Sequence, residues 1–153
     1  MFPSLNNKSN TFWNPNNFTY IDCYASGSQS IPNGGSGANV SFDTVRSSNN
    51  WGTRTSNSTF TPPVAGYYYV SYFLDWASSS SGTRYCSMIK NGTTAFAASE
   101  SQGSAAGTLQ QNGSYCIYFN GTTDSLVVSC FQASGGALNI GAGASITFQW
   151  LHP

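Results

Sequence analysis

One segment of the chain carries large apolar side chains at consecutive positions. Residues 67–76 read YYYVSYFLDW, and a strand sends alternate side chains to opposite faces. One face would carry Tyr68, Val70, Tyr72, Leu74 and Trp76. The other face would carry Tyr67, Tyr69, Ser71 and Phe73. An antiparallel strand with one face in water alternates apolar and polar residues, so this pattern predicts a strand that is covered on both faces.

Shorter strand-like stretches, separated by turns rich in Gly, Asn and Ser, fill the rest of the chain. We expect further strands at 18–24, 39–45, 83–90, 93–99, 114–119, 125–132 and 145–152, and loops at 25–38 and 46–57. Pro62-Pro63 would end a strand because proline cannot donate to a ladder, and Asn91-Gly92 predicts a hairpin turn. Eight to ten short strands without a helix or a repeat predict an all-β, two-sheet antiparallel sandwich or jelly roll.

The first 17 residues differ from the remainder of the chain. Their Pro and Asn residues argue against a helix, so we expect residues 1–17 to form an extended N-terminal arm and residues 18–153 to form one jelly-roll domain. The arm carries three large aromatic residues that are candidates for docking to another protein: Phe2, Phe12 and Trp13.

The chain is almost free of charge. Only 7% of its residues are charged, where about 25% is usual. Five cations balance five anions, which excludes a nucleic-acid binder because such a protein needs a basic footprint. No apolar run approaches the roughly 18 residues of a membrane span, so we expect no membrane insertion. Since charge repulsion cannot keep such a chain soluble, we expect a symmetric oligomer whose subunits cover the second face of strand 67–76.

Five short motifs follow one another in a recognisable order. They are Phe42-Asp43, residues 60–68 (FTPPVAGYY), Lys90-Asn91-Gly92, residues 119–124 (FNGTTD) and residues 148–153 (FQWLHP). This order resembles the complement C1q globular head family, a branch of the tumour necrosis factor-like (TNF-like) jelly rolls. The resemblance covers about residues 18–153, although Val70 and Gln149 stand where the family has Phe and Gly.

The resemblance implies a ten-stranded jelly roll that assembles as a tight homotrimer with aromatic residues along its axis. This agrees with the strand that is apolar on both faces. The candidates for the trimer interface are Tyr67, Tyr68, Tyr69, Tyr72, Phe73 and Phe148.

The sequence offers no convincing catalytic, cofactor or metal site. His152, the single histidine, lies next to the C-terminal residue, and no G-x-S-x-G motif occurs. Of the carboxylates, Asp75 is the most unusual because it lies on the apolar strand. We expect it to form a salt bridge with Arg84 or Arg46, or a hydrogen bond at a subunit contact. We therefore predict a protein that is not an enzyme and holds no cofactor.

The remaining candidates are cysteines, sequons and exposed aromatics. The cysteines at 23, 86, 116 and 130 lack CxxC spacing, which argues against zinc, and we expect them to be buried and reduced. Trp13, Trp51 and Trp76 are candidates for stacking on sugars, although such residues more often pack in a core. Seven Asn-x-Ser/Thr sequons are present, at Asn7, Asn17, Asn39, Asn57, Asn91, Asn112 and Asn120.

Two functions fit these observations. The chain begins without the apolar h-region of a secretory signal, which favours assembly in a cytosol. The first function is a homotrimeric structural protein of a virion surface, a capsid knob or fibre tip, which docks to capsid or tail proteins through its arm and adheres to a host glycan or protein through its loops. The alternative is a secreted, extracellular C1q-like module that recognises a protein or glycan ligand.

Overall fold

Two antiparallel sheets form the computed structural model, which describes residues 18–104 and 107–153. The docking candidates Phe2, Phe12 and Trp13 lie outside these residues. The described strands are β1 (Tyr20–Tyr24), β2 (Gln29–Ile31), β3 (Ala38–Asn39), β4 (Thr44–Asn49), β5 (Ala65–Trp76), β6 (Ser79–Lys90), β7 (Thr94–Ser104), β8 (Leu109–Asn120), β9 (Leu126–Gln132), β10 (Leu138–Ile140) and β11 (Ser145–His152). The prediction of an all-β two-sheet sandwich is confirmed, with eleven strands in the described chain where the resemblance implied ten.

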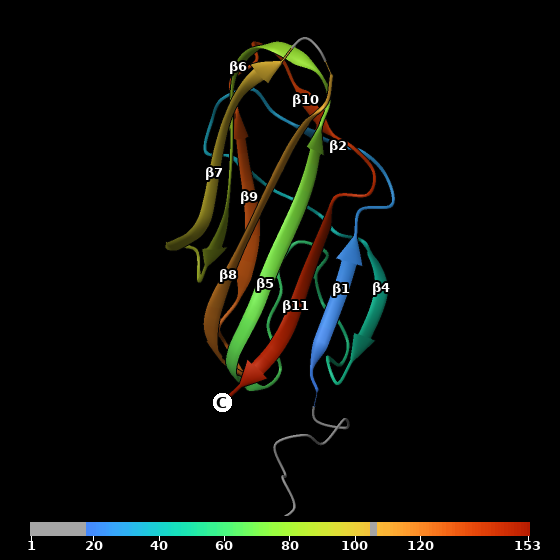
Figure 1. Cartoon of the computed structure of the whole chain (residues 1–153), viewed down its shortest axis with the longest axis vertical. Coiled ribbons are helices and arrows are strands. Elements are labelled where there is room, and N and C mark those ends of the chain that lie inside the picture. The colour runs from blue at the N-terminus through green and yellow to red at the C-terminus, as the bar shows by residue number, and fades with distance from the viewer. Residues whose placement is uncertain (1–17, 105–106) are drawn as a thin grey trace, which may run out of the picture.

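The large sheet is built around β5 (Figure 1). Its strand order is β2-β10-β5-β11-β1-β4, and β8 pairs with the other edge of β5 over the full length of both strands. The small sheet has the order β3-β9-β6-β7. The turn between β6 and β7 of the small sheet is the predicted hairpin turn: Asn91 and Gly92 both have positive φ, 52° and 71°, which is typical of a type I′ turn.

Several strand boundaries differ from those predicted. Strand β4 lies largely inside the expected loop 46–57, and β2 lies inside the expected loop 25–38. Both strands are polar sequences that pair at the outer edges of the large sheet, β4 with β1 and β2 with β10. Each of these edge strands has a partner on one side only, and the partner of β2 is distant in the sequence. Local residue propensity therefore predicts neither strand well.

The core lies between the sheets and is rich in aromatic rings. The predicted alternation along β5 is confirmed, because its inward side chains are at most 3% exposed. Phe148 stacks on Phe60 with ring centroids 5.1 Å apart and lies 5.2 Å from Trp51. Tyr68 meets Trp51 and Phe119 edge-on, at 6.2 and 5.7 Å. Such pairs add to the stabilisation that comes from area burial alone.

Some of the expected surface residues belong to this core. Tyr68, Tyr72 and Phe148 were candidates for the trimer interface, but they are 0–3% exposed between the sheets. The hydroxyl of Tyr68 donates to the carbonyl oxygen of Val64 at 3.0 Å, and burial raises the pKa of Tyr68 to about 12. Trp51 and Trp76 are also buried, at 6% and 0%, so they pack in the core, as expected for most such residues, and are not available to stack on sugars.

Polar groups inside the sandwich are tied to backbone carbonyls. Arg84 is 1% exposed, and its guanidinium donates to the carbonyl oxygens of Ser79, Ser81 and Gly82 at 2.5–3.1 Å. Arg46 pairs instead with Asp22 at 2.8 Å. The predicted salt bridge from Asp75 to either arginine is therefore wrong, because both guanidiniums have other partners. Nowhere in residues 18–104 and 107–153 is there a helix with the length and apolarity of a membrane span.

Candidate functional site

The outward side of the large sheet presents an aromatic surface. We call Tyr20, Tyr67, Tyr69, Phe73 and Tyr118 the aromatic face. Tyr67, Tyr69 and Tyr118 are 40–45% exposed, while Tyr20 and Phe73 are half-buried. These side chains share one side because they sit at alternate positions of β1, β5 and β8, strands that belong to the same sheet.

Strand register brings the aromatic face together. Tyr67 lies opposite Tyr118, with ring centroids 5.4 Å apart in an edge-on arrangement, and the ring of His152 lies 5.1 Å from Tyr67 on the other side. Tyr69 lies between Cys116 of β8 and Gln149 of β11. Three rings thus form a continuous patch across the end of the sheet at which β11 finishes.

The aromatic face is almost without charge. Among the outward side chains of β5, β8 and β11, all of them described, Asp75 is the one Asp, Glu, Lys or Arg residue. It lies at the far end of β5, opposite Gln110. Its Oδ1 atom is buried without a hydrogen-bond partner in the described residues, and an unsatisfied buried oxygen costs about 1–3 kcal/mol. A donor from outside this part of the chain would remove that cost.

The Asp22–Arg46 pair marks the other boundary of the surface. It lies where β1 pairs with β4, and the guanidinium also stacks over the ring of Tyr24, with its carbon 5.1 Å from the centroid. Arg46 is 54% exposed in its side chain, so the pair contributes little to stability. Its position at the β1–β4 edge leaves Asp75 as the one charged side chain on the outward side of β5, β8 and β11.

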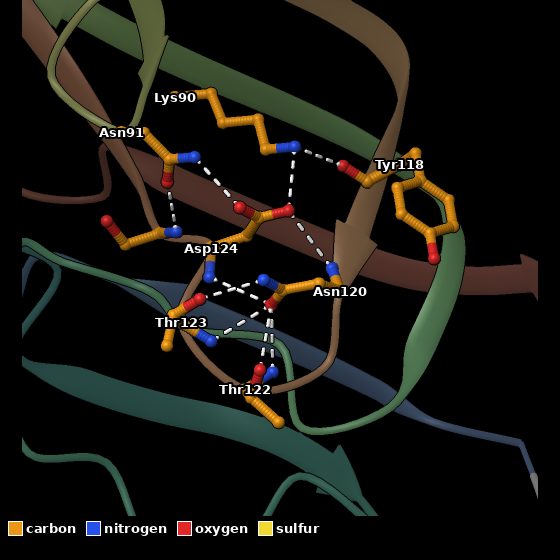
Figure 2. A network of polar contacts seen from close by, with 8 residues as sticks. Lys90, Asn91, Tyr118, Asn120, Thr122, Thr123 and Asp124 are labelled. Atoms are coloured by element: carbon orange, nitrogen blue, oxygen red, sulfur yellow. Dashed lines mark hydrogen bonds and ion pairs between the residues drawn. The ribbon is translucent and has the colours of Figure 1, made fainter.

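A polar network closes the end of the sandwich beside Tyr118 (Figure 2). Lys90 Nζ lies 2.8 Å from Asp124 Oδ2 and donates to the carbonyl oxygen of Tyr118 at 2.7 Å. Asn91 Nδ2 donates to Asp124 Oδ1 at 2.8 Å. The lysine hydrogen bond and then that of Asn91 hold the pKa of Asp124 below its usual value of 3.8.

Asn120 organises the turn within this network. Its Oδ1 accepts hydrogen bonds from the backbone N–H groups of Thr122, Thr123 and Asp124 at 2.9–3.0 Å. Its own N–H donates to Asp124 Oδ2 at 3.0 Å. An asparagine that bonds its own following backbone favours such turns. The network therefore fixes the connection between β8 of the large sheet and β9 of the small sheet.

His152 and the four cysteines are the candidate reactive groups of the described residues. His152 is exposed, and its Nδ1 lies 2.8 Å from the carbonyl oxygen of Pro153. No group of three or more His, Cys, Asp or Glu side chains in residues 18–104 and 107–153 is close enough to hold a metal ion. None of the four cysteines forms a disulfide; Cys23, Cys86 and Cys130 are buried, whereas Cys116 is exposed on the large sheet, contrary to the prediction.

Sequence reasoning identified part of the aromatic face. Tyr67, Tyr69 and Phe73 lie on it as predicted for that side of β5. Tyr20 and Tyr118 were missed. The sequence SYCIYF at 114–119 does alternate, with Ser114, Cys116 and Tyr118 on one side, but only the pairing of β8 with β5 shows which side faces outward.

Comparisons with known proteins identify the fold. No protein-family model and no curated protein matches the sequence. Murine APRIL has a TM-score of 0.66 at 9% identity, over 88% of this chain and 99% of that one. The globular domain of zebrafish complement 1qA scores 0.58 at 13% identity, over 87% and 96%. The vertex protein P5 of PRD1 scores 0.61 at 19% identity, over 88% and 97%. The chain thus has the C1q/TNF-like jelly-roll fold.

Proposed function

We propose that this protein is a homotrimeric structural component of a virion surface, a capsid decoration or fibre-tip module. Three copies would pack through the aromatic face, and residues 1–17 would dock the trimer to capsid or tail proteins. The observation that carries the proposal is an uncharged, tyrosine-rich face on a jelly roll that is also the fold of the PRD1 vertex protein. The protein would then act by assembly and adhesion and not by catalysis.

The composition of the aromatic face supports self-association. Subunit interfaces are enriched in tyrosine and depleted of charge at their centres, and the patch around Tyr67, Tyr69 and Tyr118 has both properties. If the rotation that relates neighbouring subunits closes, such a contact produces a ring with a small number of subunits. The unpaired Oδ1 of Asp75 at the end of the same face supports the earlier expectation that this carboxylate meets a donor from another subunit.

The two ends of the sandwich suit two different tasks. Phe18 leads into β1 beside the end of β11, because Tyr20 pairs with Gln149. The arm 1–17 is therefore attached at the same end as the C-terminus. The turns after β5 and β9 lie at the opposite end, where β5 finishes at Trp76 (Figure 1). In this proposal the first end faces the capsid and the second faces a host glycan or protein.

Three measurements test the proposal. Light scattering coupled to gel filtration should give three times the chain mass of 16.3 kDa; a monomer at micromolar concentration would overturn the trimer. Mass spectrometry of purified virions should find the chain, and the variant Phe2→Ala/Phe12→Ala/Trp13→Ala should remain trimeric but fail to bind virions. Val45→Ala, a substitution of an exposed residue within the domain, should bind normally. Absence of the chain from virions would contradict the virion role alone.

The match to the zebrafish complement 1qA domain favours a second candidate, a secreted module that recognises a protein or glycan. Glycans at exposed sequons such as Asn57 and Asn112 would support it. Asn91 and Asn120 are less suitable acceptors, because both ends of each side-chain amide are hydrogen-bonded in the polar network. Intact-mass measurement on protein purified from its natural source separates the two candidates.

A further inference from the structure

Two cysteines of the small sheet place their thiols against each other in the core. Cys86 of β6 and Cys130 of β9 lie directly opposite in the antiparallel register. Their Sγ atoms are 2.7 Å apart, and the residues are 0% and 1% exposed. Ordinary non-bonded carbon contacts lie at about 3.5–4.0 Å, so this approach is much closer than packing alone requires.

The backbone at this pair already has the spacing that a disulfide needs. Opposite residues in antiparallel strands have Cα atoms about 4.5 or 5.5 Å apart. A disulfide accepts Cα separations of about 4.4–6.8 Å and an S–S bond of about 2.04 Å. The two Sγ atoms are 2.7 Å apart, so they need to approach by well under 1 Å to reach the length of the bond. Small side-chain rotations are enough for that movement.

The surroundings of the pair tolerate the loss of its thiol protons. Gln111 Oε1 lies 3.1 Å from Cys86 Sγ and also accepts a hydrogen bond from Trp76 Nε1 at 2.8 Å. The Nε2 atom of Gln111 donates to the backbone carbonyls of Arg84 and Ser99. If Cys86 loses its proton, the indole N–H still satisfies Gln111, so no buried polar atom of this residue is left without a partner.

We propose that Cys86 and Cys130 are a redox modification site, at which a small-molecule disulfide such as oxidised glutathione forms an intramolecular bridge between β6 and β9. One thiolate attacks the reagent, which forms a mixed disulfide and releases one thiol. The second cysteine sulfur then displaces the second thiol. Two S–H bonds are lost, one protein S–S bond forms, and the two electrons reduce the S–S bond of the reagent.

Burial controls when this reaction occurs. Desolvation, and then the neighbouring Cys86 thiol, raise the pKa of the Cys130 thiol, and only the thiolate attacks a disulfide efficiently. The bridge therefore forms while the sheet is open, before or during folding. Once formed it joins two strands whose cysteines are 44 positions apart, which restricts the unfolded chain and raises the melting temperature.

The test is refolding of the full chain in a buffer of reduced and oxidised glutathione, followed by denaturation and alkylation with iodoacetamide. The expected product is about 2 Da lighter than the reduced chain, takes up two alkyl groups in place of four, and yields a peptide that links Cys86 to Cys130. It should also melt several degrees above protein refolded in dithiothreitol. Four alkylated cysteines after refolding in the oxidising buffer would overturn the proposal.

Cys116→Ser is the matched control. It removes the one exposed thiol and leaves the pair in place, so the variant should still form the bridge and should retain one alkylated residue, Cys23. Because the substitution lies on the surface, the variant is expected to fold. A bridge that includes Cys23 or Cys116 in the wild-type chain, or loss of the bridge in Cys116→Ser, would show that the pairing is different from the one proposed.

Discussion

Lys90 and Asp124 form an ion pair of 2.8 Å between Nζ and Oδ2, with side chains only 18% and 14% exposed. Lys90 is the last residue of β6, and Asp124 lies in the turn between β8 and β9. The two residues belong to motifs at 90–92 and 119–124 that looked independent in the sequence. In the folded chain they are halves of one network that joins the small sheet to the large one (Figure 2).

Asp124→Asn should destabilise the protein at neutral pH but not at acidic pH. The pKa of Asp124 is lowered in the folded state, first by the hydrogen bond from Lys90 and then by that from Asn91. Its stabilisation is therefore present above its usual pKa of 3.8 and is lost as the pH falls through the lower, folded pKa. Loss of charged hydrogen bonds should cost about 1–3 kcal/mol at pH 7.

Urea unfolding at pH 7 and near pH 2 measures this difference. The gap between wild type and Asp124→Asn should shrink at the acidic pH, because the native carboxyl gains a proton as the pH falls through its folded pKa. Glu100→Gln is the control, because Glu100 is exposed and its substitution should change stability by less than about 0.5 kcal/mol. An equal gap at both pH values would contradict the role of the charge.

Tyr69→Lys should weaken self-association. Tyr69 lies near the middle of the aromatic face, between Cys116 and Gln149, and an unpaired ammonium is costly at the centre of an interface. The average mass from light scattering should fall toward that of a single chain. Tyr115→Lys is the matched control: Tyr115 is 52% exposed but points to the other side of β8, against Phe96. Equal effects of the two substitutions would argue against the aromatic face as the interface.

Phe148→Ala should cost about 3–5 kcal/mol of unfolding free energy, as is typical when a buried aromatic ring is removed. The ring is 0% exposed and contacts Trp51, Phe60 and Phe119. Leu151→Ala, three residues further along β11, is the control because Leu151 is 42% exposed. Urea denaturation at one fixed protein concentration measures both. A small effect of Phe148→Ala would show that the core can collapse around the cavity.

Two glycines with similar positive φ angles should differ in their tolerance of alanine. Gly82 and Gly92 have φ of +66° and +71°, a region that costs an L-residue about 1–2 kcal/mol. A Cβ at Gly92 meets nothing within 4 Å, whereas one at Gly82 would lie 1.7 Å from the carbonyl oxygen of Ala133. Gly82→Ala should therefore lower the melting temperature clearly more than Gly92→Ala. Similar losses would mean that the loop at Ala133 moves freely.

Local pattern was enough to determine the class of this protein and the alternation of its central strand. Residues 67–76 separate into two faces because the period of a strand is a property of the strand itself. The Asn91-Gly92 turn was predictable for a similar reason, since two consecutive positive φ angles depend on those two residues. The scarcity of charge likewise predicts a surface that is covered by other subunits, and that part stays a prediction.

Tertiary structure alone decided which face of β5 is buried. Both faces carry tyrosines, and Tyr68 lies in the core while Tyr67 is exposed only because the small sheet packs on one side. The strand β4, the carbonyl partners of Arg84 and the meeting of Cys86 with Cys130 also depend on register between distant segments. Local sequence specifies period and turn geometry, but pairing across many residues follows from the packing of the whole chain.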